Sequence, residues 1–406
     1  MSQCRFCKTQ LTHEFIDLVN APPSNDFLKR DQLNCEEVYW PLKLYVCEKC
    51  YLVQVEEHKS AREIFSSDYV YFSSFSRSWL AHCEKYVNAM ISRFSLNKTS
   101  RVVELASNDG YLLKFFKDQS IPCLGIEPTA STAEVAKSKG IETLVRFFGK
   151  DCATDVIKSH GSANLIAANN VLAHVPDLND FVGGIKILLA QNGVFTGEFP
   201  HLLQMVQQCQ FDTIYHEHFS YFSFHTIIEI FKSQGLSVFD VEELSTHGGS
   251  LRIYADHGAQ KTTAAVNALL QKEKEAGVTK MAFYKGFQAA ADNVKHSFLR
   301  FLLQAKKDGK RVVGYGAAAK GNTLLNYCGV KKDLLDFVVD LSPHKQGRFL
   351  PGAHIQVVHE DLLKKEKPDY VVILPWNLRS EITEQLKYIR SWDGKFVTAI
   401  PELEVF

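Results

Sequence analysis

Short apolar runs alternate with amphipathic stretches over much of this chain, and together they predict two separate α/β units. In the first unit, the apolar runs are typical of strands and the segments between them show helical periodicity. The predicted strands of this unit are residues 101–105, 122–126, 163–168 and 194–198. Strands that alternate with helices indicate a parallel sheet covered by helices on both faces.

A closing pair of strands and a helical stretch separate this unit from the second one. Residues 236–243 and 250–256 are predicted strands joined through a turn that contains two glycines. Residues 262–307 contain no proline and carry mixed charge, which indicates long helices between domains. The predicted strands of the second unit are residues 311–315, 335–340, 370–374 and 396–400. We therefore expect three domains, at residues 1–70, 71–257 and 258–406.

The composition narrows the class of protein. The 46 Lys and Arg residues balance 46 Asp and Glu residues, and 46% of the 406 residues are hydrophobic. These values exclude wholesale disorder and a nonspecific polyanion binder. The sequence has no run of about 18 apolar residues and does not open with a secretory signal. We expect a cytoplasmic protein with no nucleic-acid partner and no membrane contact.

Two C-x-x-C pairs near the N-terminus predict a metal site. Cys4 and Cys7 form the first pair, and Cys47 and Cys50 form the second. Each pair can present two thiolates from a tight turn, and four thiolates complete the tetrahedral cage that Zn²⁺ favours. Buried free thiols and a redox pair are the alternatives, although a redox motif needs only one pair. Because four sulfur ligands leave no open coordination position, we expect the zinc to be structural.

A polar turn after the first predicted strand is the candidate cofactor site. Gly110 begins the following helix and allows a ligand to approach the backbone closely. Glu127 ends the next strand, where its carboxylate could accept hydrogen bonds from both hydroxyls of a ribose. The candidate cofactor-binding residues of this region are Glu104, Ala106, Asn108, Asp109, Gly110, Glu127 and Pro128.

This pattern is common to NAD and S-adenosylmethionine (SAM), since both contain adenosine. The turn lacks the G-x-G-x-x-G sequence that a diphosphate needs, and Asp109 would repel a phosphate. Asn108 and Asp109 suit the charged amino-acid end of SAM better. We therefore favour SAM, with helix capping by Asn108 and Asp109 as the alternative.

Further motifs give the chain a family resemblance over essentially its whole length. The turn, residues 125–128 and residues 169–177 resemble class I SAM-dependent methyltransferases, and Asn169 and Asn170 join the candidate cofactor residues. With the four-cysteine module and residues 215–221, 247–252 and 314–323, the chain resembles nucleotide-sugar C-methyltransferases. These enzymes methylate C3 of NDP-4-keto-6-deoxyhexoses in branched-sugar biosynthesis. Ala106 is a departure, because many class I enzymes have glycine there.

This resemblance implies an α/β fold with three parts. They are a small N-terminal zinc-binding module, a central class I methyltransferase Rossmann-like sheet, and a C-terminal Rossmann-like α/β domain that contributes to sugar-nucleotide binding. The implied cofactors are SAM and structural Zn²⁺, and the implied partner is a nucleotide-activated 4-keto sugar, expected to be TDP-linked. The assignment to C3 comes from the resemblance alone, because acidity beside a C4 ketone permits C3 or C5.

Carbon methylation beside a ketone needs a base and a group that stabilises the enolate. His218 is the candidate base, since imidazole titrates near neutral pH, and Glu217, Tyr215 or His216 could orient it or donate to the enolate. In the resembling enzymes, the residues that match His218, Glu217, Tyr215 and His174 line the active site. A metal site at residues 216–218 is an alternative that lacks H-E-x-x-H spacing. His174 could equally be a packed histidine at a strand end.

Aromatic residues upstream and downstream are further candidates. Residues 68–74 resemble the family segment that caps cofactor and substrate, with Tyr69 as the first candidate and Tyr71 as the second. The alternative is aromatic packing between the zinc module and the sheet. Phe147 and Phe148 could stack on adenine or belong to the core.

Two glycine-containing segments are candidate substrate sites. Residues 247–252 offer a turn and a fixed cation that could close over the sugar nucleotide, or they form a plain hairpin turn. Residues 316–323 nearly reproduce a phosphate-binding loop, but Asn322 replaces its lysine, which excludes ATP hydrolysis. Open backbone amides there suit a phosphate or sugar, with helix capping as the alternative. The candidate substrate residues are His247, Gly249, Ser250, Arg252, Lys320 and Asn322.

Two other functions compete with sugar methylation. One is an NAD-dependent nucleotide-sugar oxidoreductase that uses either α/β half. The other is a non-catalytic nucleotide-sugar-binding protein, which would bind ligand without forming product.

Overall fold

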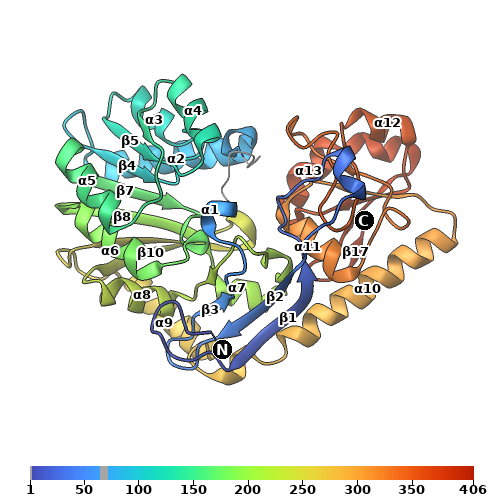
Figure 1. The fold of residues 1–406 in the computed structure, drawn as a ribbon, viewed down its shortest axis with the longest axis horizontal. Coiled ribbons are helices and arrows are strands. Elements are labelled where there is room, and N and C mark those ends of the chain that lie inside the picture. Colours follow the sequence, from blue (N-terminus) through green and yellow to red (C-terminus); the bar gives the residue numbers. More distant parts are fainter. Residues whose placement is uncertain (1, 65–71) are drawn as a thin grey trace.

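The computed structural model describes residues 2–64 and 72–406, and it contains three β-sheets. Two α/β units lie side by side, with the N-terminal strands below and between them (Figure 1). The fold is therefore mixed α/β with a small N-terminal module, as the sequence predicts. The domain boundaries at residues 70 and 257 stay a prediction.

The central unit is a seven-stranded sheet in the order β10-β11-β8-β7-β4-β5-β6. The strands from β6 to β8 are parallel, whereas β11 and β10 run antiparallel to their neighbours. The order reverses between β4 and β7, which makes the carboxyl end of β4 a typical ligand position. The strands are β4 (Val102–Leu105), β5 (Cys123–Ile126), β6 (Thr143–Leu144), β7 (Ala163–Asn169), β8 (Leu189–Pro200), β10 (Ser237–Leu244) and β11 (Ser250–Asp256).

Helices pack on both faces of this sheet, and capping side chains set where some of them begin. The side chains of Ser76, Asp177 and Ser223 each accept a hydrogen bond from a backbone amide in the first turn of the next helix. The helices of this unit are α2 (Arg77–Phe94), α3 (Leu113–Asp118), α4 (Ala130–Ser138), α5 (Lys150–His160), α6 (Leu178–Leu188), α7 (Leu202–Gln207) and α8 (Phe224–Ser233).

The C-terminal unit is a six-stranded sheet in the order β14-β13-β12-β15-β16-β17. It is parallel except for β17, and its order reverses between β12 and β15. The strands are β12 (Val312–Tyr315), β13 (Val338–Val339), β14 (Val357–Val358), β15 (Tyr370–Ile373), β16 (Lys395–Thr398) and β17 (Glu404–Val405). The helices are α11 (Ala319–Cys328), α12 (Asp361–Glu366) and α13 (Arg379–Gln385). In both units, the strand order thus reverses beside the first parallel strand, which is β4 in one and β12 in the other.

The N-terminal sheet joins the module to the central unit. Its antiparallel order is β1-β2-β3-β9, with β1 at His13–Ala21, β2 at Trp40–Val46 and β3 at Val53–Val55. The fourth strand, β9 (Ser220–Tyr221), comes from the middle of the chain and pairs with β3. Residues 40–46 and 52–55 are strand-like in the sequence and correspond to β2 and β3, whereas the sequence does not predict β1 or β9. The short helix α1 (Ala61–Ile64) follows this sheet.

Two long helices connect the α/β units, as the proline-free stretch predicts. They are α9 (Ala264–Ala276) and α10 (Phe287–Lys307). The ring of Phe287 stacks on Phe15 of β1 with a centroid distance of 4.8 Å. This contact fixes α10 along the N-terminal sheet and the C-terminal unit (Figure 1).

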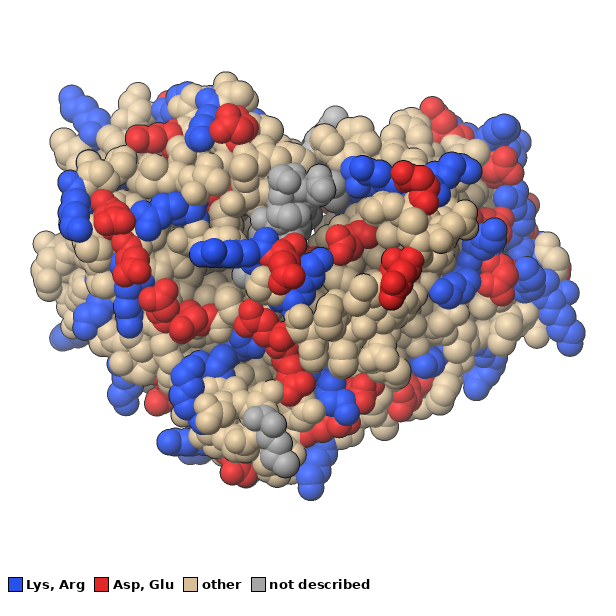
Figure 2. All heavy atoms as spheres, viewed as in Figure 1, with Lys and Arg blue, Asp and Glu red and all other residues tan. Residues whose placement is uncertain are grey.

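Charge is well mixed on the surface. On the face shown in Figure 2, Lys and Arg side chains alternate with Asp and Glu side chains over both units. None of the described helices is long and apolar enough to cross a membrane.

Candidate active site

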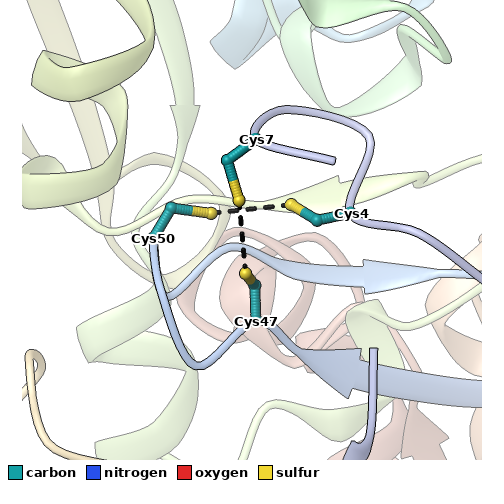
Figure 3. Close-up of side chains that lie close together, drawn as sticks. All are labelled: Cys4, Cys7, Cys47 and Cys50. Carbon is teal, nitrogen blue, oxygen red and sulfur yellow. Dashed lines mark hydrogen bonds between the residues drawn. The ribbon is translucent and has the colours of Figure 1, made fainter. Parts of the chain in front are cut away.

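The four predicted metal ligands converge in the N-terminal module (Figure 3). The Sγ atoms of Cys4 and Cys50 are 3.5 Å apart, as are those of Cys7 and Cys47. All four sulfur atoms lie within 4.8 Å of one another. A tetrahedral zinc with bonds of about 2.3 Å requires sulfur atoms about 3.8 Å apart. The cluster therefore fits a Cys₄ zinc site, whose chemistry is structural.

The turn after β4 has the backbone of a ligand-binding loop. Ala106 and Asn108 adopt left-handed conformations with φ of 52° and 48°, and Gly110 has a φ of 75°. Ala106 therefore takes the same kind of backbone path that a glycine would take, at a cost of about 1 kcal/mol for an L-residue. A Cβ on Gly110 would lie 2.4 Å from Ile141. Both this close contact and the positive φ therefore favour glycine at this position.

Glu127 closes this turn from the neighbouring strand. Its two carboxylate oxygens accept hydrogen bonds of 2.8 Å from the backbone amides of Asn108 and Thr129. A carboxylate offers about four acceptor positions, so both oxygens retain capacity for ribose hydroxyls. Burial raises the pKa of Glu127, and it raises that of the fully buried Glu104 well above its ordinary value. Pro128 lies between Glu127 and the second amide donor.

Buried polar atoms without hydrogen-bond partners gather at the same sheet edge. Among the described residues, the Oγ of Ser107, the Oδ1 of Asp109 and both amide atoms of Asn169 have no partner. Leaving such groups unpaired costs about 1–3 kcal/mol each, so the edge is suited to a polar ligand. The other Asp109 oxygen accepts hydrogen bonds from Lys139 and Ser74. These groups fit the hydroxyls and charged end of SAM.

The C-terminal unit repeats the carboxylate arrangement of Glu127. Asp340 follows β13, and its two oxygens accept hydrogen bonds of 2.8 Å from the amides of Ala317 and Ser342. Ala317 lies in the turn after β12, and Gly316 before it has a φ of 88°. The sequence reasoning missed Asp340, although an acidic residue at the end of a predicted strand was the signal that could have found it.

His218 is held in a defined orientation. Its Nδ1 lies 3.0 Å from the carbonyl oxygen of Thr213, and its Nε2 lies 2.7 Å from the hydroxyl of Tyr215. A backbone carbonyl only accepts, so Nδ1 carries the proton and Nε2 accepts from Tyr215. Burial, together with the positive charge on Lys320, lowers the pKa of His218 well below its ordinary value. The imidazole is therefore neutral at pH 7 with an unprotonated Nε2, but it is a weaker base than the near-neutral titration expected from the sequence.

His174 meets His218 edge to face, with ring centroids 4.7 Å apart. Its Nδ1 lies 2.8 Å from the carbonyl oxygen of Glu217, and burial lowers its pKa to about 4. Both histidines thus present a neutral ring, and the two rings are in contact.

The three residues 216–218 point in different directions. Glu217 is 2% exposed, and both of its carboxylate oxygens lie 2.8 Å from the Nδ2 of Asn25. His216 instead directs Nε2 toward the carbonyl of Pro41, at 3.2 Å. Among the described residues, the only group of three or more possible metal ligands is the four-cysteine cluster. The alternative of a metal site at residues 216–218 is therefore not supported.

Lys320 enters the site from the C-terminal unit. Its Nζ lies 3.3 Å from the carbonyl of His247 and 3.2 Å from the Oδ1 of Asn377, and it faces the ring of Trp376 at 4.9 Å. The indole of Trp376 donates to Asp212 at 2.8 Å. Burial raises the pKa of Asp212 to about 6 and lowers the pKa of Lys320. Lys320 therefore contacts the turn at His247, and its helix reaches the segment of His218 through Thr323, whose hydroxyl donates to the carbonyl of Ile214 at 2.8 Å.

The other candidate substrate residues are distributed around this junction. His247 has a φ of 55°, and its Nε2 lies 3.2 Å from the Nδ2 of Asn170. Gly249 packs against Gln204, and the hydroxyl of Ser250 donates to the carbonyl of Thr246 at 2.9 Å. Both side-chain amide atoms of Asn322 are buried without a partner among the described residues. These orphaned atoms lie on the first turn of α11, beside Lys320.

Arg252, the fixed cation of the candidate segment at residues 247–252, is engaged by carboxylates of the protein itself. Its guanidinium donates to Glu198 at 2.6 and 2.9 Å and to Glu242 at 2.9 Å. The imidazole of His82 adds a contact of 2.9 Å to Glu198. Arg252 is 5% exposed and belongs to this buried ion network between β8, β10 and β11. A role for Arg252 in substrate binding stays a prediction.

The four aromatic candidates are not among the contacts described above, and two of them lie outside the described residues. Tyr69 and Tyr71 fall in the part of the chain that the structure does not describe. Phe148 packs against Phe181 at 5.3 Å, and Phe147 is 40% exposed. The sequence reasoning missed Asn25, Asp212 and Trp376, because no local pattern marks their contacts with the site.

Family models match consecutive parts of the chain. The model described as "Putative zinc binding domain" matches residues 4–65, and the "Methyltransferase domain" model matches residues 79–241. The "C-methyltransferase C-terminal domain" model matches residues 245–401. Together the three models span residues 4–401, with short gaps between them.

A curated relative and several solved structures are also similar. The C-methyltransferase NovU of Streptomyces niveus is 31% identical over 407 residues, covering 100% of this chain and 97% of its own. A SAM-dependent methyltransferase from Anabaena variabilis is 18% identical, with a TM-score of 0.35 over 44% of this chain and 86% of its own. Magnesium protoporphyrin IX methyltransferase from Synechocystis, solved with bound SAH, is 13% identical, with a TM-score of 0.33 over 43% of this chain and 81% of its own.

Proposed function

The chain belongs to the family of SAM-dependent C-methyltransferases, and from that premise we propose that it methylates C3 of an NDP-4-keto-deoxysugar through an enolate. The observation that carries this proposal is the neutral, buried His218, whose Nε2 is hydrogen-bonded to the hydroxyl of Tyr215. Methylation of carbon, unlike that of a free amine, requires such a base. The proposed products are branched sugars.

The proposed base is Nε2 of His218. The C3–H bond of the substrate breaks, the proton moves to Nε2, and the electron pair stays on the substrate as an enolate. Tyr215 donates its hydroxyl to the one lone pair of Nε2, so this hydrogen bond must break before Nε2 takes the C3 proton, and the freed hydroxyl would then donate to the enolate oxygen. Glu217 and His174 orient the two segments around this pair, and Tyr69 remains a proposed contact.

The proposed SAM site is the edge at the carboxyl ends of β4, β5 and β7. SAM, when bound, supplies an electrophilic methyl group. Glu127 would hold the ribose hydroxyls, and the orphaned polar atoms of Asp109 and Asn169 would bind the charged amino-acid end. The full proposed set is Glu104, Ala106, Asn108, Asp109, Gly110, Glu127, Pro128, Asn169 and Asn170.

The proposed nucleotide site lies at the equivalent edge of the C-terminal unit. Asp340 would bind the sugar of the nucleoside, as Glu127 would for adenosine. Lys320 and Asn322 are available to the diphosphate, on the first turn of α11. A hollow of about 480 Å³ at the carboxyl ends of β15 and β16 is lined in part by Trp376, whose ring also lies 4.9 Å from the Nζ of Lys320. We propose that the nucleotide is TDP.

The test is turnover of TDP-4-keto-6-deoxyglucose with SAM, followed by mass spectrometry and NMR of the product. The expected product carries one added methyl group on C3, and the substrate exchanges its C3 proton with D₂O when demethylated SAM replaces SAM. Exchange or methylation at C5 would overturn the assignment of the carbon. Thermal stabilisation by NAD and not by SAM would overturn the cofactor, and stabilisation by SAM and TDP without any product would favour a binding protein.

A further inference from the structure

Residues 21–24 of the N-terminal module, at the end of β1 and in the loop after it, are buried, which is unusual for a connecting segment. Ala21 and Ser24 are 5% and 3% exposed. Loops normally run over the surface, because their backbone needs water. This loop is covered on the C-terminal side, where a Cβ on Gly352 would come within 3.0 Å of Pro22. The module therefore packs between the two α/β units.

Asn25 at the end of this loop reaches the proposed catalytic segment. Its Nδ2 is 2.8 Å from each carboxylate oxygen of Glu217. An ionised carboxylate only accepts hydrogen bonds, so the amide nitrogen, not the amide oxygen, must face it. The amide group therefore holds the Glu217 carboxylate from outside the methyltransferase unit.

A second contact ties the same module to both sides of the site. The guanidinium of Arg5, which lies between Cys4 and Cys7, donates to the carbonyls of Val55 and Pro176 at 2.7 and 2.9 Å. It also faces the ring of Phe219 at 5.3 Å. Pro176 lies two residues after His174, and Phe219 follows His218. Through Arg5, the module thus contacts both segments that carry the proposed catalytic histidines.

We propose that Asn25 is a positioning residue for methyl transfer, which holds the carboxylate of Glu217 and with it the backbone of residues 213–221. Glu217 leads directly into His218, and its carbonyl oxygen binds His174, so movement of Glu217 displaces both histidines. This inference assumes the proposed function of these residues. It means that the zinc-binding module positions a residue of the proposed active site, in addition to stabilising the fold.

The test compares Asn25→Asp, Asn25→Ala and the double variant Asn25→Asp/Glu217→Gln. Asn25→Asp places two carboxylates together, and the double variant restores one donor and one acceptor with the roles exchanged. Asn20→Ala is the matched control, because Asn20 is an exposed asparagine of the same module. Each protein is checked for zinc content and SAM affinity before hydrogen–deuterium exchange of the peptide at residues 213–221 is measured.

We expect faster exchange of residues 213–221 in Asn25→Asp, recovery toward wild type in the double variant, and no change in Asn20→Ala. With TDP-4-keto-6-deoxyglucose, kcat of Asn25→Asp should fall at least tenfold while the KM for SAM stays within about twofold. Wild-type exchange and kcat in Asn25→Asp would overturn the proposal, as would faster exchange that the double variant fails to reverse. If the wild-type enzyme does not turn over this sugar, the proposed substrate is wrong, and the exchange measurement alone decides the role of Asn25.

Discussion

Glu127 and Asp340 occupy equivalent positions in the two α/β units. Each follows the strand beside the first parallel strand of its sheet, and each binds an amide of the turn after that first strand. Each also binds the amide two residues further along its own chain, again at 2.8 Å. Each sheet therefore has one carboxylate where its strand order reverses. We propose that Glu127 binds the adenosine of SAM and that Asp340 binds the nucleotide of the substrate.

This equivalence predicts a reciprocal loss of binding. Glu127→Gln should weaken SAM binding about tenfold and leave TDP binding unchanged, because a hydrogen bond to a charged group contributes about 1.5–3 kcal/mol. Asp340→Asn should do the opposite. Isothermal titration with SAM and with TDP measures both, and each variant is the control for the other. Loss of SAM affinity in Asp340→Asn would contradict the assignment of two separate sites.

Replacing the proposed base should abolish chemistry without affecting cofactor binding. His218→Asn cannot accept the substrate proton, so kcat should fall by about 10²–10⁴. Its SAM affinity should match that of the wild type, since His218 lies outside the turn after β4. His296→Asn, on an exposed position of α10, is the control. Unchanged turnover in His218→Asn would rule out this residue as the base.

Metal loss should act on both stability and catalysis. We expect about one zinc per chain by elemental analysis, because Cys₄ sites bind a single tetrahedral ion. Cys47→Ser should lose the metal and unfold at a lower temperature, since metal binding contributes directly to folding. Its kcat should also fall, because Arg5 between Cys4 and Cys7 holds the segments of the site. Cys35→Ser, at an exposed cysteine outside the cluster, should behave as wild type.

Mild acid should destabilise the protein through its buried histidines. Burial lowers the pKa of His216 to about 4, against 6.5 in the unfolded chain. Between these values the unfolded state binds the extra proton, so the free energy of unfolding decreases as pH falls below 6.5. The decrease for one histidine is at most about 1.4 kcal/mol per pH unit. His174 and His247, whose pKa values are also lowered to about 4, act in the same direction.

This acid effect can be assigned to one residue by urea denaturation at about pH 7 and about pH 5. His216→Gln removes the titrating group, and its side-chain amide can still donate to the carbonyl of Pro41. The variant should lose less stability on acidification than the wild type. The exposed His296→Gln should show the full wild-type loss. Equal losses in His216→Gln and the wild type would contradict the assignment.

The sequence alone determined the elements whose signals are local. The apolar runs of β4, β5, β7 and β8 predicted the central sheet, since strand and helix periodicities are properties of neighbouring residues. The spacing of the four cysteines predicted their convergence, because each C-x-x-C pair forms one knuckle by itself. The polar turn and Glu127 predicted the cofactor edge, since the carboxyl ends of adjacent parallel strands lie together.

Only the tertiary structure decided how distant segments meet. The pairing of β9 with β3, the contact of Asn25 with Glu217 and the hydrogen bond from Lys320 to the carbonyl of His247 all join residues far apart in the chain. The environments of Arg252 and Asp340 also depend on the tertiary structure. Arg252 is hydrogen-bonded to Glu198 of another strand, and Asp340 accepts a hydrogen bond from Ala317 in the turn after β12. Long-range packing and hydrogen bonding select these partners, and no periodicity in one sequence encodes which two segments will be neighbours.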